Sequence, residues 1–301
     1  MKTLVHLTFV TAVYIFSNAA FADINVFACE PEWGSLATEL GGDNVNVYTA
    51  TTAFQDPHRI EARPSLIAKM RRADLVICSG ADLEVGWLPL LLRSSSNKKV
   101  QLGQPGYFEA AMQVERLDVP DKVDRSMGDV HAKGNPHVHL DPRRVATIAG
   151  KLTERLIEID PDKAGNYQQR GSDFQTRWQA ALNQWNTKAA ALKGQRIVVH
   201  HKDWAYLFDW LGIEEAAVLE PKPGVPPTTS HLAGILTSLK SRPAKLIIYT
   251  SYQDSKAADW LYERANIPAM QLPFTVGGND QATNLFSLMD QTLDLLLKGT
   301  Q

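Results

Sequence analysis

The chain carries two blocks in which short apolar runs alternate with longer stretches of helical spacing. Runs of four or five apolar, often β-branched residues are typical of buried strands. Apolar positions three and four residues apart predict helices that cover such strands. Strands and helices that alternate in this way form parallel sheets covered on both faces. The pattern therefore predicts an α/β protein with two lobes, each built on a parallel sheet.

Each block predicts a sheet of four strands with helices between them. In the first block the expected strands are 24–28, 45–48, 75–78 and 100–102, and the expected helices are 32–40, 64–72, 85–92 and 143–157. An irregular segment precedes the last of these helices. In the second block the expected strands are 196–199, 216–219, 246–249 and 270–272, and the expected helices are 204–211, 231–239, 257–265 and 285–297.

One long helix is predicted between the blocks, from about residue 160 to Gly194. Pro161 near its start and the glycine at its end are typical helix boundaries. A single apolar stripe runs between them, formed by Tyr167, Phe174, Trp178, Leu182, Trp185, Ala189 and Leu192. We therefore expect an N-terminal lobe over 23–158, a linking backbone helix over 159–194 and a C-terminal lobe over 195–301.

The first 22 residues predict a secretory signal sequence. Lys2 is followed by an apolar run over residues 4–16 and then by Ala20-Phe21-Ala22, which has the small residues that precede a cleavage site. The run is too short to span a membrane comfortably, so we expect cleavage after Ala22 and a soluble protein exported to the periplasm. No cysteine follows this site in the position used for lipid attachment, so no lipid anchor is expected.

Charge and cysteine content narrow the partners and the compartment. The net charge of −2 at pH 7 argues against binding to nucleic acid or to an anionic membrane surface. The two cysteines, Cys29 and Cys78, both fall in short β-like runs. In an exported protein such a pair favours a disulfide, which neighbouring strands would bring within reach. Two buried free thiols are the alternative.

Histidines occur in three short segments, each at a strand end or in a tight loop. His58 follows Asp56-Pro57, His137 and His139 lie between the prolines at 136 and 142, and His200-His201 follow an apolar run. Residues two apart in an extended segment project to the same side, and adjacent residues to opposite sides. A polar surface loop would account for any one segment. Three of them predict a metal site assembled by folding, with His58, His137 and His201 as ligands, and imidazole suits Zn(II).

Several motifs resemble the zinc- and manganese-binding receptors of bacterial ABC importers. They are Gln55-Asp56-Pro57-His58 with Arg63-Pro64-Ser65, Ala73-Asp74-Leu75-Val76-Ile77, Gly80-Ala81-Asp82-Leu83-Glu84, Pro136-His137-Val138-His139-Leu140-Asp141-Pro142, and His201-Lys202-Asp203-Trp204-Ala205-Tyr206. The resemblance covers nearly the whole chain after the signal sequence. It implies a periplasmic solute-binding protein of two lobes with a rigid backbone helix, and it carries His58, His137 and His201 over as ligands.

The chain departs from the pattern of this family at three places. Many zinc receptors carry a long His-rich insertion before the second ligand, where this chain has a short loop with His131. His139 stands where the family usually has tryptophan. Manganese receptors supply an acid directly after the last strand, where this chain has Val276, so we expect Asp280 to be the fourth ligand. A water molecule or His131 is the alternative, and His131 and His139 are auxiliary metal candidates.

The resemblance implies capture and delivery of a metal ion rather than catalysis. We expect a monomer that binds Zn(II) with high affinity and delivers it to an inner-membrane ABC permease, with a periplasmic metallochaperone as a further candidate partner. Three histidines and one carboxylate favour zinc, because manganese prefers oxygen-rich octahedral sites. A manganese receptor of the same family is the first alternative.

Two other classes of protein fit parts of the pattern. A secreted zinc hydrolase would use three ligands and an open position, with Glu30, Glu32 or Asp203 as base, but the sequence has no H-E-x-x-H motif. A receptor of the same fold for a metal chelate or cobalamin would need aromatic and basic lining rather than converging histidines. The histidine pattern therefore favours the metal receptor.

Overall fold

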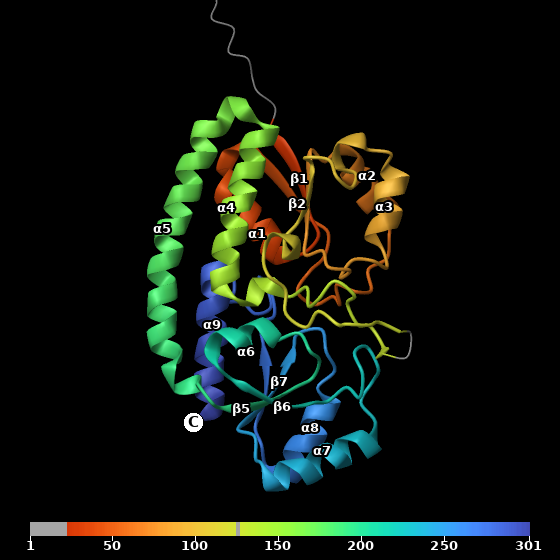
Figure 1. Cartoon of the computed structure of the whole chain (residues 1–301), viewed down its shortest axis with the longest axis vertical. Coiled ribbons are helices and arrows are strands. Elements are labelled where there is room, and N and C mark those ends of the chain that lie inside the picture. The colour runs from red at the N-terminus through yellow and green to blue at the C-terminus, as the bar shows by residue number, and fades with distance from the viewer. Residues whose placement is uncertain (1–22, 125–126) are drawn as a thin grey trace, which may run out of the picture.

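The computed structural model describes residues 23–124 and 127–301, so the predicted signal sequence lies outside the described residues. It shows two α/β lobes with one long helix beside both of them (Figure 1). The predicted fold class is confirmed. Within the described residues, no helix combines the length and the apolar composition needed to cross a membrane.

A parallel sheet with strand order β2-β1-β3-β4 forms the centre of the N-terminal lobe. Its strands are β1 (Ile24–Ala28), β2 (Val45–Thr49), β3 (Leu75–Cys78) and β4 (Tyr107–Glu109). The first helix, α1 (Pro31–Gly41), packs on one face of the sheet. The helices α2 (Pro64–Arg72) and α3 (Leu88–Ser95) pack on the other face.

The fourth strand does not lie where the sequence pattern placed it. The expected strand 100–102 is wrong, because Lys98–Val100 forms a 3-10 helix and the strand that pairs with β3 begins at Tyr107. Val100 is buried, whereas Leu102 is 69% exposed and therefore has no core to face. Phe108, which is 1% exposed, fills the buried position of the true strand.

The C-terminal lobe repeats the same topology with strand order β6-β5-β7-β8, again parallel. Its strands are β5 (Arg196–Val199), β6 (Glu214–Val218), β7 (Leu246–Thr250) and β8 (Ala269–Leu272). Its helices are α6 (Ala205–Leu211), α7 (Thr229–Ser241), α8 (Lys256–Ala265) and α9 (Leu285–Thr300). In both lobes the strand that comes first in the chain occupies an inner position, with the second at the edge.

The predicted long helix is present as α5 (Ala164–Lys188), with short 3-10 turns at both ends. It packs against α4 (Pro142–Ile159), α1 and α9, and so contacts elements of both lobes (Figure 1). Gly171 allows α4 and α5 to approach closely, since a Cβ there would lie 2.7 Å from Oγ1 of Thr153. The residue limits of the lobes given above remain a proposal.

One apolar core runs through both lobes on the side of the long helix. Val26 of β1, Val199 of β5 and Trp178 of α5 belong to the same buried cluster. The faces covered by α2 and α3, and by α7 and α8, form separate smaller clusters. Because close-packed interiors deform little, we expect movement at the opposite side to involve loops more than the lobes themselves.

A disulfide joins the carboxyl ends of two neighbouring strands in the N-terminal lobe. Cys29 directly follows β1 and Cys78 ends β3, and the structure pairs them, as the sequence predicted. Both lie on the face that carries Phe27 and Val76, because side chains alternate along a strand. The backbone N–H of Cys29 donates to the carbonyl of Ile77 at 2.8 Å.

Candidate metal centre

Loops at the carboxyl ends of the strands bring the predicted histidines together. His58 lies on the loop after β2, His137 immediately precedes the 3-10 turn Val138–Leu140, and His201 follows β5. The ring centroids of His58 and His137 are 6.0 Å apart, and those of His58 and His201 are 5.8 Å apart. Ligands of open parallel sheets bind at this edge, so the three loops define a candidate metal centre.

A fourth histidine joins this cluster from the irregular segment that precedes α4. Nε2 of His131 lies 3.2 Å from Nε2 of His58. One ring nitrogen each from His58, His131 and His137 lie within 4.8 Å of one another, which is the separation expected of groups that share one metal ion. From the sequence, His131 is only an alternative to Asp280 as fourth ligand and an auxiliary candidate, because no periodicity places its loop.

His137 is the most unusual of these side chains. It is 1% exposed, and neither ring nitrogen has a hydrogen-bond partner among the described residues. Burial, together with the neighbouring histidines, lowers the pKa of His137 well below its ordinary value. A neutral imidazole with both nitrogens unsatisfied is costly to bury, and a metal ion would satisfy one of them.

Carboxylates orient two of the other histidines. Nδ1 of His58 lies 2.7 Å from Oδ1 of Asp56, and Nδ1 of His201 lies 2.6 Å from Oε2 of Glu220. Each contact occupies one ring nitrogen and leaves Nε2 for another partner, which is the arrangement typical of metal-bound histidine. Burial alone would raise the pKa of Asp56, but the hydrogen bonds from His58 lower it below the ordinary value.

The loop that carries His131 is held from both sides. Nη2 of Arg59 lies 3.3 Å from a carboxylate oxygen of Asp129, and Nζ of Lys133 lies 3.1 Å from Asp82. The N–H of Asp129 also donates to the carbonyl of Pro223 at 2.9 Å. Burial, followed by the charges of neighbouring histidines, lowers the pKa of His131 to about 4, so this ring is neutral at pH 7.

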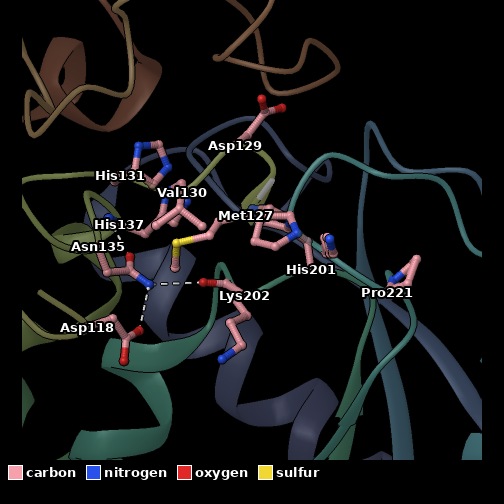
Figure 2. Close-up of a pocket in the computed structure, with 12 residues that line it drawn as sticks. Asp118, Met127, Asp129, Val130, His131, Asn135, His137, His201, Lys202 and Pro221 are labelled. Carbon is pink, nitrogen blue, oxygen red and sulfur yellow. Dashed lines mark hydrogen bonds between the residues drawn. The ribbon is translucent and has the colours of Figure 1, made fainter. Parts of the chain in front are cut away.

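An open pocket of about 430 Å³ adjoins the cluster. His131 and His137 line it from the irregular segment before α4, and His201 lines it from the loop after β5 (Figure 2). Asn135 fixes the central segment, since its side chain donates to the carbonyl of Lys202 at 2.9 Å, the bond drawn in Figure 2. The pocket gives the histidines a route to solvent.

Two predicted residues are not among the grouped ligand atoms: His139, whose ring centroid lies 6.4 Å from that of His137, and Asp280. His139 is buried with Nε2 3.0 Å from the carbonyl of Phe274 and Nδ1 3.2 Å from Glu32, which indicates a structural role. Asp280 is exposed on the loop after β8 and is not one of the residues that line the pocket. Its role as a ligand therefore stays a prediction.

Sequence reasoning missed the orienting acids, although one signal was present. Asp56 stands two residues before His58 in the segment Asp56-Pro57-His58, a spacing at which an aspartate side chain can contact the following residues. Glu220 follows β6 and reaches His201 only because β6 pairs with β5. Strand pairing of this kind is not visible in the sequence alone. His200, next to His201, lines a different pocket, as their adjacency predicted.

Curated relatives of similar length include receptors for different metals. The manganese ABC transporter substrate-binding lipoprotein scaA of Streptococcus gordonii is 20% identical over 94% of this chain and 91% of its own length. The high-affinity zinc uptake system protein ZnuA of Bacillus subtilis is 22% identical over 80% of this chain and 76% of its own.

Solved structures share the fold. A crystal structure of ZnuA superposes with a TM-score of 0.75 at 18% identity, over 91% of this chain and 99% of that one. The manganese-bound periplasmic metal-binding protein of Candidatus Liberibacter asiaticus gives a TM-score of 0.75 at 16% identity, over 93% and 100%. The family model described as zinc-uptake complex component A, periplasmic, matches residues 26–299, and the chain therefore belongs to this family of metal-binding receptors of ABC importers.

Proposed function

We propose that this chain captures Zn(II) in the periplasm and delivers it to the permease of an ABC importer. The convergence of ring nitrogens from His58, His131 and His137 carries this proposal, and the ring centroid of His201 lies 5.8 Å from that of His58. We assign His58, His137 and His201 as ligands. His131 is the fourth nitrogen donor that the geometry favours, with Asp280 as the alternative if its loop moves toward the pocket.

The donor set favours zinc over manganese. Imidazole nitrogens suit zinc in tetrahedral sites, whereas manganese prefers carboxylate, carbonyl and water oxygens in octahedral ones. Among the relatives, B. subtilis ZnuA is named for zinc and S. gordonii scaA for manganese, so metal choice varies between similar proteins. The imidazole-rich cluster of this chain supports the zinc assignment.

Competition binding with Zn(II) and Mn(II) tests this proposal directly. We expect the mature protein to bind zinc more than roughly 100-fold tighter than manganese, because its donors are imidazole nitrogens and manganese prefers oxygen ligands. Equal affinity, or tighter manganese binding, would identify a manganese receptor instead.

The variant Asp280→Asn tests whether this acid is a ligand. Loss of a ligand weakens zinc binding, whereas loss of an exposed loop acid does not.

Loss of the orienting acids is expected to weaken zinc binding without removing the ligands. Asp56→Asn and Glu220→Gln should each lower zinc affinity by about 10–100-fold, as for other carboxylates that support metal-bound histidine. The exposed Glu61, three residues after His58, provides a matched control as Glu61→Gln. If Asp56→Asn and Glu220→Gln bind zinc as tightly as the control does, these two acids do not orient ligands.

The pH dependence of zinc binding should be set by the loss of a proton from His201. Burial alone would lower the pKa of His201, but its hydrogen bond to Glu220 and the nearby acids outweigh burial and raise the pKa above the ordinary value. This ring must lose a proton when zinc binds, whereas His131 and His137 are already neutral. Below the raised pKa, we therefore expect affinity to fall about tenfold per pH unit.

Competition titrations with a chromophoric chelator between about pH 8 and about pH 5 measure this slope. In Glu220→Gln the decline should begin at a lower pH, because the charge that raises the pKa of His201 is gone. A decline that starts at the same pH in both proteins would show that another group releases the proton.

Delivery and location follow from the same assignment. We propose that the signal sequence directs the chain to the periplasm, that the receptor acts as a monomer and that its partner is an inner-membrane permease. A periplasmic metallochaperone is the further candidate partner. The secreted hydrolase considered above is excluded, because the family consists of substrate-binding receptors of ABC importers and not of enzymes.

A further inference from the structure

A second group of metal-binding side chains lies in the N-terminal lobe, separate from the histidine cluster. The sulfur atoms of Cys29 and Cys78 and a carboxylate oxygen of Glu84 lie within 4.8 Å of one another. The cysteines are fully buried and Glu84 is 2% exposed. Such a mixture of sulfur and oxygen donors is one that zinc accepts once the sulfurs are thiolates.

Glu30 lies beside Glu84, although it is not one of the three residues of this group. It is the residue after Cys29, is 3% exposed, and interacts directly with Glu84. Its Oε2 accepts from the N–H of Ser79 at 3.2 Å, but its Oε1 is buried without a hydrogen-bond partner among the described residues. A buried carboxylate oxygen without a partner is energetically costly unless a proton or a cation neutralises it.

Burial favours the protonated form of both acids in the oxidised protein. Burial and the charge of Glu84 raise the pKa of Glu30 well above its ordinary value, and burial raises the pKa of Glu84 to about 7. The other groups that act on Glu30 are a third acid, Glu32, and the backbone of Ser79. Two buried carboxyl groups in direct contact are costly while both are charged.

The backbone brings Glu84 to the sulfurs through an unusual turn. Gly80, Ala81 and Asp82 have φ angles of 74°, 49° and 70°. Alanine and aspartate rarely adopt this left-handed region, because their Cβ crowds the following carbonyl oxygen. The turn reverses the chain so that the Glu84 carboxylate accepts from the N–H of Gly80 at 3.1 Å, beside the end of β3.

We propose that reduction of the Cys29–Cys78 disulfide opens a second site for Zn(II) or a similar thiophilic divalent ion, held by Cys29, Cys78 and Glu84. The reductant is a dithiol: one of its thiolates attacks the disulfide, two electrons pass to the cysteine pair, and the dithiol leaves as its own disulfide. The two cysteine thiols then release one proton each to solvent as the metal binds. This inference does not depend on which metal the histidine cluster captures.

Metal content of the oxidised and the reduced mature protein tests this site. The protein is reduced with a dithiol, freed of it by anaerobic gel filtration, loaded with zinc and measured by elemental analysis. We expect about one zinc per chain in the oxidised form and about two in the reduced form. With Co(II) in place of zinc, a thiolate-to-cobalt charge-transfer band should appear only after reduction.

Three variants separate this site from the histidine cluster. Cys29→Ala/Cys78→Ala should bind about one zinc under both conditions, and Glu84→Gln should weaken the second ion by more than roughly tenfold while its thiols remain. His58→Ala/His137→Ala should lose the first ion and keep the reduction-dependent one, so that failure of either site is recognised by itself.

Three results would overturn the proposal. They are an unchanged zinc content after reduction, a cobalt spectrum without the charge-transfer band, and loss of the circular dichroism signal of the folded chain on reduction. The last result counts against the site because its three ligands come from segments that only the fold brings together.

Discussion

Replacing His137 by leucine is expected to stabilise the metal-free protein while it abolishes tight zinc binding. Both ring nitrogens of His137 are buried without a hydrogen-bond partner among the described residues. Removing such groups should raise the free energy of unfolding by about 1–3 kcal/mol. Loss of a ligand at the centre of the cluster should weaken zinc binding by more than roughly 100-fold, beyond the effect of a supporting residue.

Denaturant unfolding of the metal-free protein, paired with zinc titration, measures both effects. His139→Leu is the matched control from the same segment, because His139 is equally buried but its Nε2 lies 3.0 Å from a carbonyl oxygen. That variant should lose about 1–3 kcal/mol of stability. A His137→Leu protein that is less stable than the wild type would show that the imidazole is satisfied in the metal-free state.

Removing the disulfide is expected to produce the largest change in stability. The bridge between Cys29 and Cys78 closes a loop across a sequence separation of 49 residues. In the chain-entropy treatment of the unfolded state, such a closure contributes about 4 kcal/mol. We therefore expect Cys29→Ala/Cys78→Ala to lower the free energy of unfolding by that amount and to remain folded, since domains have about 5–15 kcal/mol.

Urea unfolding of the oxidised wild type, the reduced wild type and the double variant tests this expectation. The reduced wild type without metal should resemble the variant, because both lack the cross-link. A loss below about 1 kcal/mol in both would mean that the unfolded chain is already restricted near these residues.

Much of the fold follows from periodicity, because buried strands and amphipathic helices each leave a distinct pattern. The stripe from Tyr167 to Leu192 predicted the long helix, and it is the buried face of α5 and the turn after it. The strand expected at 100–102 failed because one buried valine does not define an alternating pattern. The pairing of Cys29 with Cys78 followed from two β-like runs that became neighbours in one sheet.

The sequence predicted those residues of the candidate site that follow a strand. It did not predict the position of residues in irregular segments. His58 and His201 follow strands of two parallel sheets, so their convergence rests on topology. His131 lies in a segment without periodicity, and its place depends on contacts such as that of Arg59 with Asp129. Such contacts join residues far apart in the chain, and no local sequence pattern predicts them.

Zinc content of the mature wild type beside His58→Ala, His137→Ala and His201→Ala tests the central claim most directly. His231→Ala is the control. His231 lies on α7, and its Nε2 lies 2.9 Å from the carbonyl oxygen of Val218. We predict about one zinc per chain in the oxidised wild type and the control, and none or greatly weakened binding in the three variants. A wild type without zinc, or zinc retained in all three variants, would contradict the assignment of this cluster as the metal centre.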